Sequence, residues 1–147
     1  MNIQIRPVKE GDFADIVELF KEFALFEKHP EKMTNSVEQM LKEKEYFHCF
    51  LAETPKNEII GYVTYFFSYH TWTGKSLYMD DLYVKADFRN QGIGKRLLDA
   101  VIGYARHEKC NKVRWQVSNW NKKAQEFYKK IGAEIDDVEL NCDLPLK

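Results

Sequence analysis

The sequence predicts a single α/β domain in which a mixed, mostly antiparallel central sheet carries helices on both faces. Three observations predict this fold. The first half of the 147-residue chain holds several segments with strand-like alternation, and the second half runs strand, helix, strand, helix, strand. The length fits one ordinary domain, so we expect residues 1–147 to form one folded unit.

The N-terminal third begins with a strand and continues into helices. Residues 3–8 alternate apolar and polar side chains, which predicts the first strand. Asp12 then opens a helical pattern, and Asn35 or Ser36 could cap a second, short helix after the break at Pro30. The apolar residues of the first helix recur at helical spacing: Ile16, Leu19, Phe20, Phe23 and Phe26.

The middle of the chain predicts antiparallel strands. Residues 46–53 and 59–68 are rich in β-branched and aromatic side chains, and the turn at 55–57 between them indicates a hairpin. Apolar residues alternate again over 76–85, which predicts a fourth strand ending at Val84.

The remaining elements alternate between helix and strand. Residues 92–107 form an amphipathic helical pattern that starts within a glycine-containing turn. A strand over 112–117 and a helix over 121–130 follow, and Gly132 lies where a C-terminal cap glycine is expected. Residues 133–144 are expected to supply at least one last strand.

Composition excludes several classes of protein. The formal net charge of -1 gives no field for nucleic acid or an anionic membrane. Cys49, Cys110 and Cys142 are odd in number and far apart, so we expect neither a disulfide framework nor a metal site. The first residues lack an apolar signal core, and no stretch reaches membrane-spanning length. We therefore expect a soluble, cytoplasmic protein.

The loop after the fourth strand has the pattern of an anion-binding site. It joins a strand to a helix through two closely spaced glycines, Gly92 and Gly94. Unpaired amides at a helix start, with the helix dipole, favour a bound phosphate, and Arg89 and Lys95 would add positive charge. Leu97 replaces the third glycine of a dinucleotide fingerprint, and the alternative is a simple turn.

At this loop the chain resembles the GCN5-related N-acetyltransferase (GNAT) superfamily, whose signature matches Arg89-Asn90-Gln91-Gly92-Ile93-Gly94. The resemblance implies acetyl-CoA as co-substrate, a splayed strand pair that receives it, and pairing into homodimers. Coenzyme-binding residues implied by the resemblance are Leu82, Tyr83, Val84, Arg89, Asn90, Gln91, Gly92, Ile93, Gly94, Lys95, Asn121 and Tyr128.

The likeness extends over nearly the whole chain to the diamine (spermidine/spermine and thialysine) N-acetyltransferase branch. It is carried by blocks such as residues 69–75, 77–81 and 127–133. The branch usually has Glu-Asp where this chain has Asp80-Asp81, and an acidic residue where this chain has His70. The resemblance implies transfer of acetyl to a primary amine of a small aliphatic substrate.

Acetyl transfer to an amine needs a base for the ammonium proton and an acid for the departing thiolate. The resemblance assigns the acid to Tyr128, whose alternative role is a core aromatic. Asp80 is the first candidate for the base, with Asp81 beside it, and the alternative for both is a solvated strand end. A backbone N–H near Tyr83 or Val84 would meet the oxyanion.

The acceptor side is expected to hold an acidic group and aromatic faces, which suit an ammonium ion. The substrate-binding residues expected there are Glu27, Tyr69, His70, Trp72, Asp80 and Asp81. Exposed-face and packing roles remain alternatives for Glu27 and Trp72. Asn121 is expected to cap the last helix and to contact the pantetheine arm. Two other functions stay open: acetylation of a protein amine, and a non-catalytic acyl-CoA-binding module.

Overall fold

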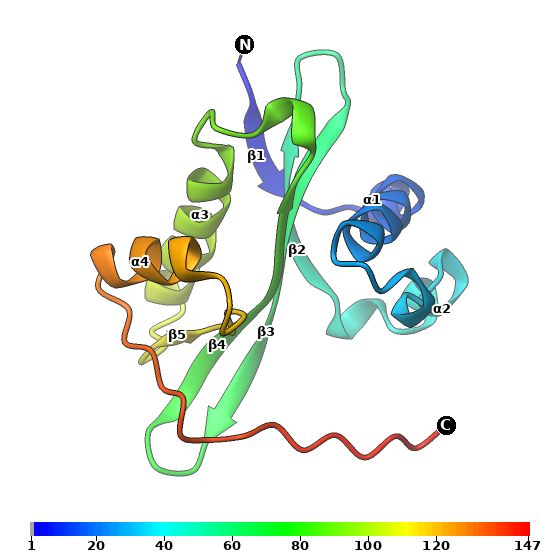
Figure 1. Ribbon diagram of the computed structural model, residues 1–147. Coiled ribbons are helices and arrows are strands. Elements are labelled where there is room, and N and C mark those ends of the chain that lie inside the picture. Colours follow the sequence, from blue (N-terminus) through cyan, green and yellow to red (C-terminus); the bar gives the residue numbers. More distant parts are fainter. Residues whose placement is uncertain (1) are drawn as a thin grey trace. The chain divides into compact units, whose positions relative to one another are not determined.

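The computed structural model describes residues 2–147. Contacts between residues divide the chain into two compact units, one ending at Trp115 and one covering Gln116–Lys147. The first unit contains the whole sheet and most of the helices (Figure 1).

Five strands form one sheet in the order β1-β2-β3-β4-β5. The strands are β1 (Gln4–Pro7), β2 (His48–Glu53), β3 (Ile59–His70), β4 (Gly74–Val84) and β5 (Val113–Arg114). The first four are joined antiparallel, and β5 pairs parallel to β4. The predicted mixed, mostly antiparallel sheet is therefore confirmed.

The helices follow the expected order. They are α1 (Phe13–Phe26), α2 (Val37–Lys42), α3 (Ile93–His107) and, in the second unit, α4 (Lys122–Lys130). Of the two caps predicted for α2, Ser36 is the one used: its Oγ accepts the Gln39 N–H at 3.1 Å.

Asp12 precedes α1, yet its carboxylate is engaged elsewhere. It accepts two hydrogen bonds from Arg6, at 2.8 and 2.9 Å, and one from the Lys9 N–H at 2.7 Å. Arg6 also bonds Glu53 at 3.1 Å, so one half-buried guanidinium joins β1, β2 and the start of α1. The hydrogen bonds from Arg6 hold the pKa of Asp12 below its ordinary value.

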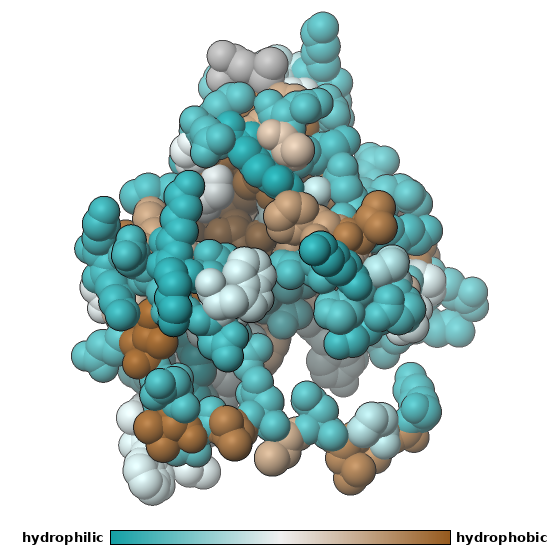
Figure 2. Space-filling view, viewed as in Figure 1, coloured by the Kyte–Doolittle hydropathy of each residue, from teal (hydrophilic) through white to brown (hydrophobic). Residues whose placement is uncertain are grey.

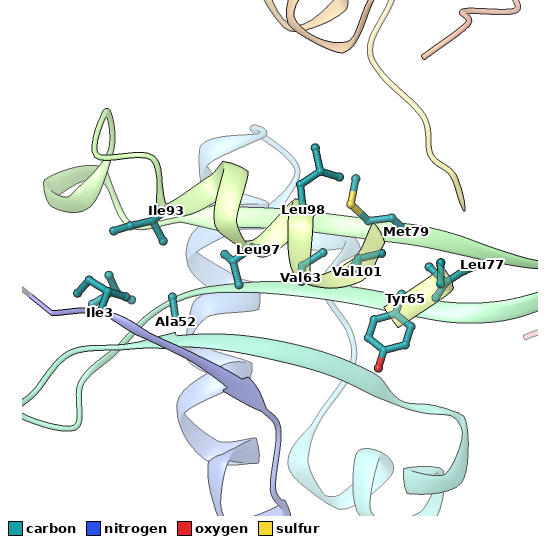
Figure 3. Packing of buried hydrophobic residues seen from close by; sticks show 12 residues of the cluster. Ile3, Ala52, Val63, Tyr65, Leu77, Met79, Ile93, Leu97, Leu98 and Val101 are labelled. Atoms are coloured by element: carbon teal, nitrogen blue, oxygen red, sulfur yellow. The ribbon is translucent and has the colours of Figure 1, made fainter. Parts of the chain in front are cut away.

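Each face of the sheet packs against a different helix, as predicted (Figure 1). Leu97, Leu98 and Val101 of α3 pack with Val63 and other strand residues; we call this group the α3-side cluster (Figure 3). On the opposite face, α1 contributes to the α1-side cluster, whose buried members are Ile16, Leu19, Cys49, Leu51, Ile59, Tyr62 and Tyr83. Phe26, expected in the apolar stripe of α1, is instead 59% exposed.

Two predicted strands differ from the structure. β5 covers only Val113 and Arg114 of the predicted 112–117. The last strand predicted over 133–144 is wrong, because residues 133–147 form no helix or strand. Apolar side chains still alternate with polar ones along this segment, visible as separate brown groups in Figure 2, but Val138 is 77% and Leu140 85% exposed. An alternating pattern forms a strand only when another strand receives its backbone hydrogen bonds.

Over residues 2–147, no helix has the length and apolar character that crossing a bilayer would require.

Candidate active site

The centre of the candidate site is a β-bulge in β4. Met79 lies opposite Tyr65 and Leu82 lies opposite Val63, so Asp80 and Asp81 together face the single residue Thr64. Met79 and Leu82 both pack in or against the α3-side cluster. Regular alternation would send two adjacent aspartates to opposite faces of the sheet, whereas the bulge brings both to the face of Thr64.

Thr64 stabilises this irregular backbone. Its buried Oγ1 accepts the Asp81 N–H at 3.1 Å, which satisfies an amide that the bulge removes from the regular ladder. Thr64 was not among the predicted site residues. The signal available in the sequence was the spacing of Met79 and Leu82, because two inward-facing apolar residues three apart break the strand period of two.

The environment of the two carboxylates favours their protonated forms. Burial, then the negative charge of Asp80, then that of Glu27 raise the pKa of Asp81 to about 6. Burial also raises the pKa of Asp80, although its side chain is the more exposed of the two. Carboxylates with raised pKa values accept protons more readily near neutral pH than ordinary aspartates do.

Glu27 lies at the C-terminal end of α1 and is exposed. Its charge is close enough to Asp81 to contribute to the raised pKa of that group. The structure therefore brings together three of the six predicted acceptor-side residues: Glu27, Asp80 and Asp81.

The other three lie at the far end of the β3–β4 hairpin. Tyr69 and His70 pair with Lys75 and Gly74, and Trp72 is in the turn between the strands. His70 is six residues along β3 from Thr64, which corresponds to about 20 Å of extended strand. Within one chain, this hairpin end is not next to the carboxylate pair.

Two of the three side chains at the hairpin end are strongly exposed. Tyr69 is 80% and Trp72 96% exposed. Partial burial and the positive charges of Lys112 and Arg114 lower the pKa of His70, which favours its neutral form. Its Nε2 lies 3.4 Å from the Ser68 Oγ.

The predicted anion-binding loop has the expected helix-start geometry. Gly92 is left-handed, with φ of 77°, and precedes α3, whose first backbone bond runs from the Arg96 N–H to the Gly92 carbonyl. The amides of the first turn before Arg96 are thus not engaged by the helix. A Cβ on Gly92 would meet nothing within 4 Å, and one on Gly94 would meet only Val84 Cγ2 at 3.9 Å. This open backbone fits a phosphate group.

The two basic residues of the loop have partners of their own. Arg89 donates its Nε–H to the Val84 carbonyl at 2.9 Å, and its guanidinium lies over the rings of Phe26 and Tyr83 at 4.7 and 5.5 Å. Lys95 pairs with Asp99 at 2.9 Å on the exposed side of α3. Arg89 therefore fixes the loop to the end of β4 and to α1, a role that the loop motif alone did not predict.

The strand leading into this loop has a free edge. β4 pairs with β5 only at Leu77 and Tyr78, so among residues 2–147 no strand pairs with Leu82, Tyr83 or Val84 on that side. An extended amide-containing chain can add to such an edge through main-chain hydrogen bonds. The pairing of β4 with β5 therefore ends at Tyr78, before the part of β4 where the resemblance implies a splayed strand pair.

Asn121 and Tyr128 belong to the second unit. The Asn121 Oδ1 accepts the Ala124 N–H at 3.2 Å, so the predicted cap of α4 is confirmed. Tyr128 is half-buried, with its ring 5.7 Å from that of Phe127. Burial raises the pKa of its phenol, which keeps the proton on the oxygen at neutral pH.

A surface depression of about 670 Å³ lies between α1 and the β2–β3 turn. It contains none of the predicted site residues. Its charged lining residues are Asp15, Glu18, Lys21, Glu22, Glu58 and Lys85. Lys85 and Glu58 pair across it at 3.6 Å. No cluster of metal-ligating side chains occurs in the part of the chain that the structure describes.

Comparisons with known proteins identify the family. The model of the acetyltransferase (GNAT) family matches residues 13–133. A thialysine N-epsilon-acetyltransferase from Bos taurus is 36% identical over 143 residues, which cover 90% of this chain and 84% of that protein. A spermidine/spermine N(1)-acetyltransferase-like protein from Homo sapiens is 31% identical over 88% of this chain and 20% of its own length.

A solved structure shows the same fold. An aminoglycoside acetyltransferase from an uncultured soil metagenomic sample aligns with a TM-score of 0.80 at 22% identity, over 99% of this chain and 97% of that one. The bulged β4, the open loop before α3 and these matches agree with one another: the chain belongs to the acetyltransferase (GNAT) family and is an acetyl-transferring enzyme.

Proposed function

We propose that the protein transfers the acetyl group of acetyl-CoA to a primary amine of a small aliphatic substrate: a diamine, a polyamine or a lysine-like compound. The observation that carries this proposal is the pair of carboxylates on the β4 bulge, with Glu27 nearby. Three acidic groups attract an ammonium ion, and burial raises the pKa of both Asp80 and Asp81, which favours proton removal. The similarity to a thialysine N-epsilon-acetyltransferase and to a spermidine/spermine N(1)-acetyltransferase-like protein supports the same substrate class.

Residues 82–84 and 89–95 would hold the coenzyme. The edge of β4 at Leu82, Tyr83 and Val84 receives the pantetheine arm, and the amides of the loop and of the first turn of α3 receive the pyrophosphate. Gly92 and Gly94 leave the backbone accessible, while Arg89 keeps the loop against β4. A backbone N–H near Tyr83 or Val84 stabilises the oxyanion of the tetrahedral intermediate.

The two proton transfers of the reaction are assigned to Asp80 and Tyr128. Asp80, the more exposed carboxylate, takes the ammonium proton directly or through a water, and Asp81 shares the titration of the pair. The amine then attacks the thioester carbonyl. The protonated phenol of Tyr128 donates to the departing thiolate, and Asn121 positions the start of its helix. Because the family model spans 13–133, we propose that the two units act as one domain over residues 1–147.

The hairpin end and the assembly belong to the same proposal. Tyr69, His70 and Trp72 are remote from the carboxylates of their own chain, so they would contact an acceptor only in the site of a second copy. We therefore propose a homodimer. We also propose that the protein is located in the cytoplasm. Light scattering of the purified protein would test the assembly.

The experiment that tests the function is a panel of amines with acetyl-CoA and detection of the released thiol. The panel contains diamines, polyamines, lysine analogues, amino acids and a lysine-containing peptide. We expect turnover with small aliphatic amines carrying a second cation. If the peptide is the one acceptor in the panel that is acetylated, the result would favour a protein acetyltransferase. Coenzyme binding without turnover of any amine would favour a non-catalytic acyl-CoA-binding module.

A further inference from the structure

One buried polar atom is not used by the proposed chemistry. The hydroxyl of Tyr62 has no hydrogen-bond partner in the part of the chain that the structure describes, and the Tyr62 side chain is fully buried. Buried hydroxyls are nearly always hydrogen-bonded, because leaving one unsatisfied forfeits its hydration. An orphaned phenol in the centre of a sheet therefore calls for a specific explanation.

The strand register places this phenol near the bulge and on the same face of the sheet. Tyr62 lies on β3 opposite Tyr83, with ring centroids 6.0 Å apart, and the ring of Phe20 from α1 lies 5.0 Å from it. Tyr62 is two residues before Thr64, so both side chains lie on the same face of the sheet, the face to which the bulge brings Asp80 and Asp81.

The electrostatics agree with this placement. After burial, the charge of Asp81 is the largest cause that raises the pKa of Tyr62, ahead of Cys49, Tyr83 and Asp80. The phenol therefore keeps its proton and can act only as a neutral donor or acceptor. Of the two carboxylates near Tyr62, Asp81 acts on the phenol more strongly than Asp80 does.

We infer that Tyr62 is a positioning residue for Asp81, donating its O–H to the Asp81 carboxylate through one enclosed water. The inference rests on the proposed function only in giving Asp81 a part in proton removal. A water with Tyr62, Asp81 and the Thr64 hydroxyl as neighbours has the polar partners that a buried water requires.

This arrangement offsets the repulsion on Asp81. The charged groups that act on the Asp81 carboxylate are Asp80 of β4 and Glu27 at the end of α1. Asp81 in turn acts on Tyr62 of β3, whose other titratable neighbours include Cys49 of β2 and Tyr83 of β4. Burial and both acids favour the neutral carboxyl group. A donated O–H favours the carboxylate, so Tyr62 would keep the pair able to accept a proton at neutral pH.

The test is the titration of Asp81 in the full chain, followed by ¹³C NMR of labelled aspartate carboxyls and assigned with an Asp81→Asn variant. Tyr62→Phe removes the donor and should raise the Asp81 titration midpoint by roughly one pH unit. Tyr65→Phe is the matched control, because it removes another buried phenol from β3 on the opposite face and should leave the midpoint unchanged. An unchanged midpoint in Tyr62→Phe would overturn the inference.

A second measurement covers the case in which Tyr62→Phe does not fold. In Asp81→Asn, the ¹³Cζ resonance of Tyr62 should shift while that of Tyr65 stays in place; no shift for Tyr62 would equally overturn the inference. Neither readout needs turnover. If the wild-type protein acetylates no amine, the proposed function fails while the titration still decides the role of Tyr62. If the wild-type protein does acetylate an amine, the acidic limb of the pH profile of kcat/KM should shift in Tyr62→Phe together with the titration midpoint of Asp81.

Discussion

Replacing Asp81 with asparagine should make the protein more stable at neutral pH. The folded state raises the pKa of Asp81 from 3.8 to about 6, so it binds the proton more tightly than the unfolded chain does. The contribution of the protonated Asp81 to the free energy of unfolding is fully present below pH 3.8 and is lost as the pH rises through about 6. Asparagine carries no charge and avoids this loss.

The size of the effect follows from the shift. A difference of about two pKa units corresponds to about 3 kcal/mol of folding free energy at pH 8, at 1.36 kcal/mol per unit. Asp81 is half-buried, so water reduces the repulsion and we take this value as the upper end of the gain. The gain of Asp81→Asn over wild type should be close to zero near pH 4.

Urea unfolding of both proteins between pH 4 and pH 8 measures this difference, because titrating groups that do not interact with Asp81 cancel between them. Glu27→Gln should give a smaller gain over the same pH range, since the charge of Glu27 is the weakest of the three causes acting on Asp81. A gain that is constant from pH 4 to pH 8, or a loss at pH 8, would refute the reasoning. The stabilised variant should have lost activity, as expected where a site stores unfavourable charge.

Further predictions concern the coenzyme and the acceptor. A Cβ at Gly94 would meet only Val84, so Gly94→Val should weaken acetyl-CoA binding by about tenfold or more in calorimetry without a clash, whereas Gly103→Val, in the open middle of the same helix, should not weaken it. Tyr128→Phe should lower kcat by about 10² to 10⁴ with coenzyme affinity nearly kept, and a wild-type kcat at every pH would make Tyr128 a packing residue. Glu27→Gln should raise KM for diamines by roughly two- to fivefold, as for an exposed charge pair, and equal KM values would remove Glu27 from the acceptor site.

Much of the fold could be predicted because its elements bury one-sided patterns. The helical spacing of Ile16 and Leu19, and of Leu97 and Val101, reports directly which side of each helix meets the sheet. Residues 133–144 show the limit of this reasoning. Their alternation satisfies the pattern of a strand, but a strand also needs a neighbour with free backbone groups, and that neighbour is not encoded in the segment itself.

The candidate site was predictable in its residue types and less so in its geometry. The glycine pattern at 92 and 94 indicated an exposed helix start, because the requirement is local. The grouping of Asp80 and Asp81 with Glu27 depends on a bulge and on the end of α1, both set by packing between distant segments. His70 and Trp72 were expected on the acceptor side with the carboxylates because an acidic group and aromatic faces suit an ammonium ion. An extended strand instead carries His70 about 20 Å from Thr64, and Trp72 lies beyond it in the turn.

The bulge in β4 is the effect of one residue. If Asp80 were deleted, Met79 would be followed by Asp81 and Leu82, and the pairing of Tyr65 with Met79 and of Val63 with Leu82 would become regular. Every apolar side chain would keep its place in the α3-side cluster, and Asp81 alone would face Thr64. A single-codon deletion would thus yield a sheet at least as regular as the present one but with half of the carboxylate pair. In this strand, the proposed carboxylate pair and a regular sheet ladder are alternatives separated by one amino acid.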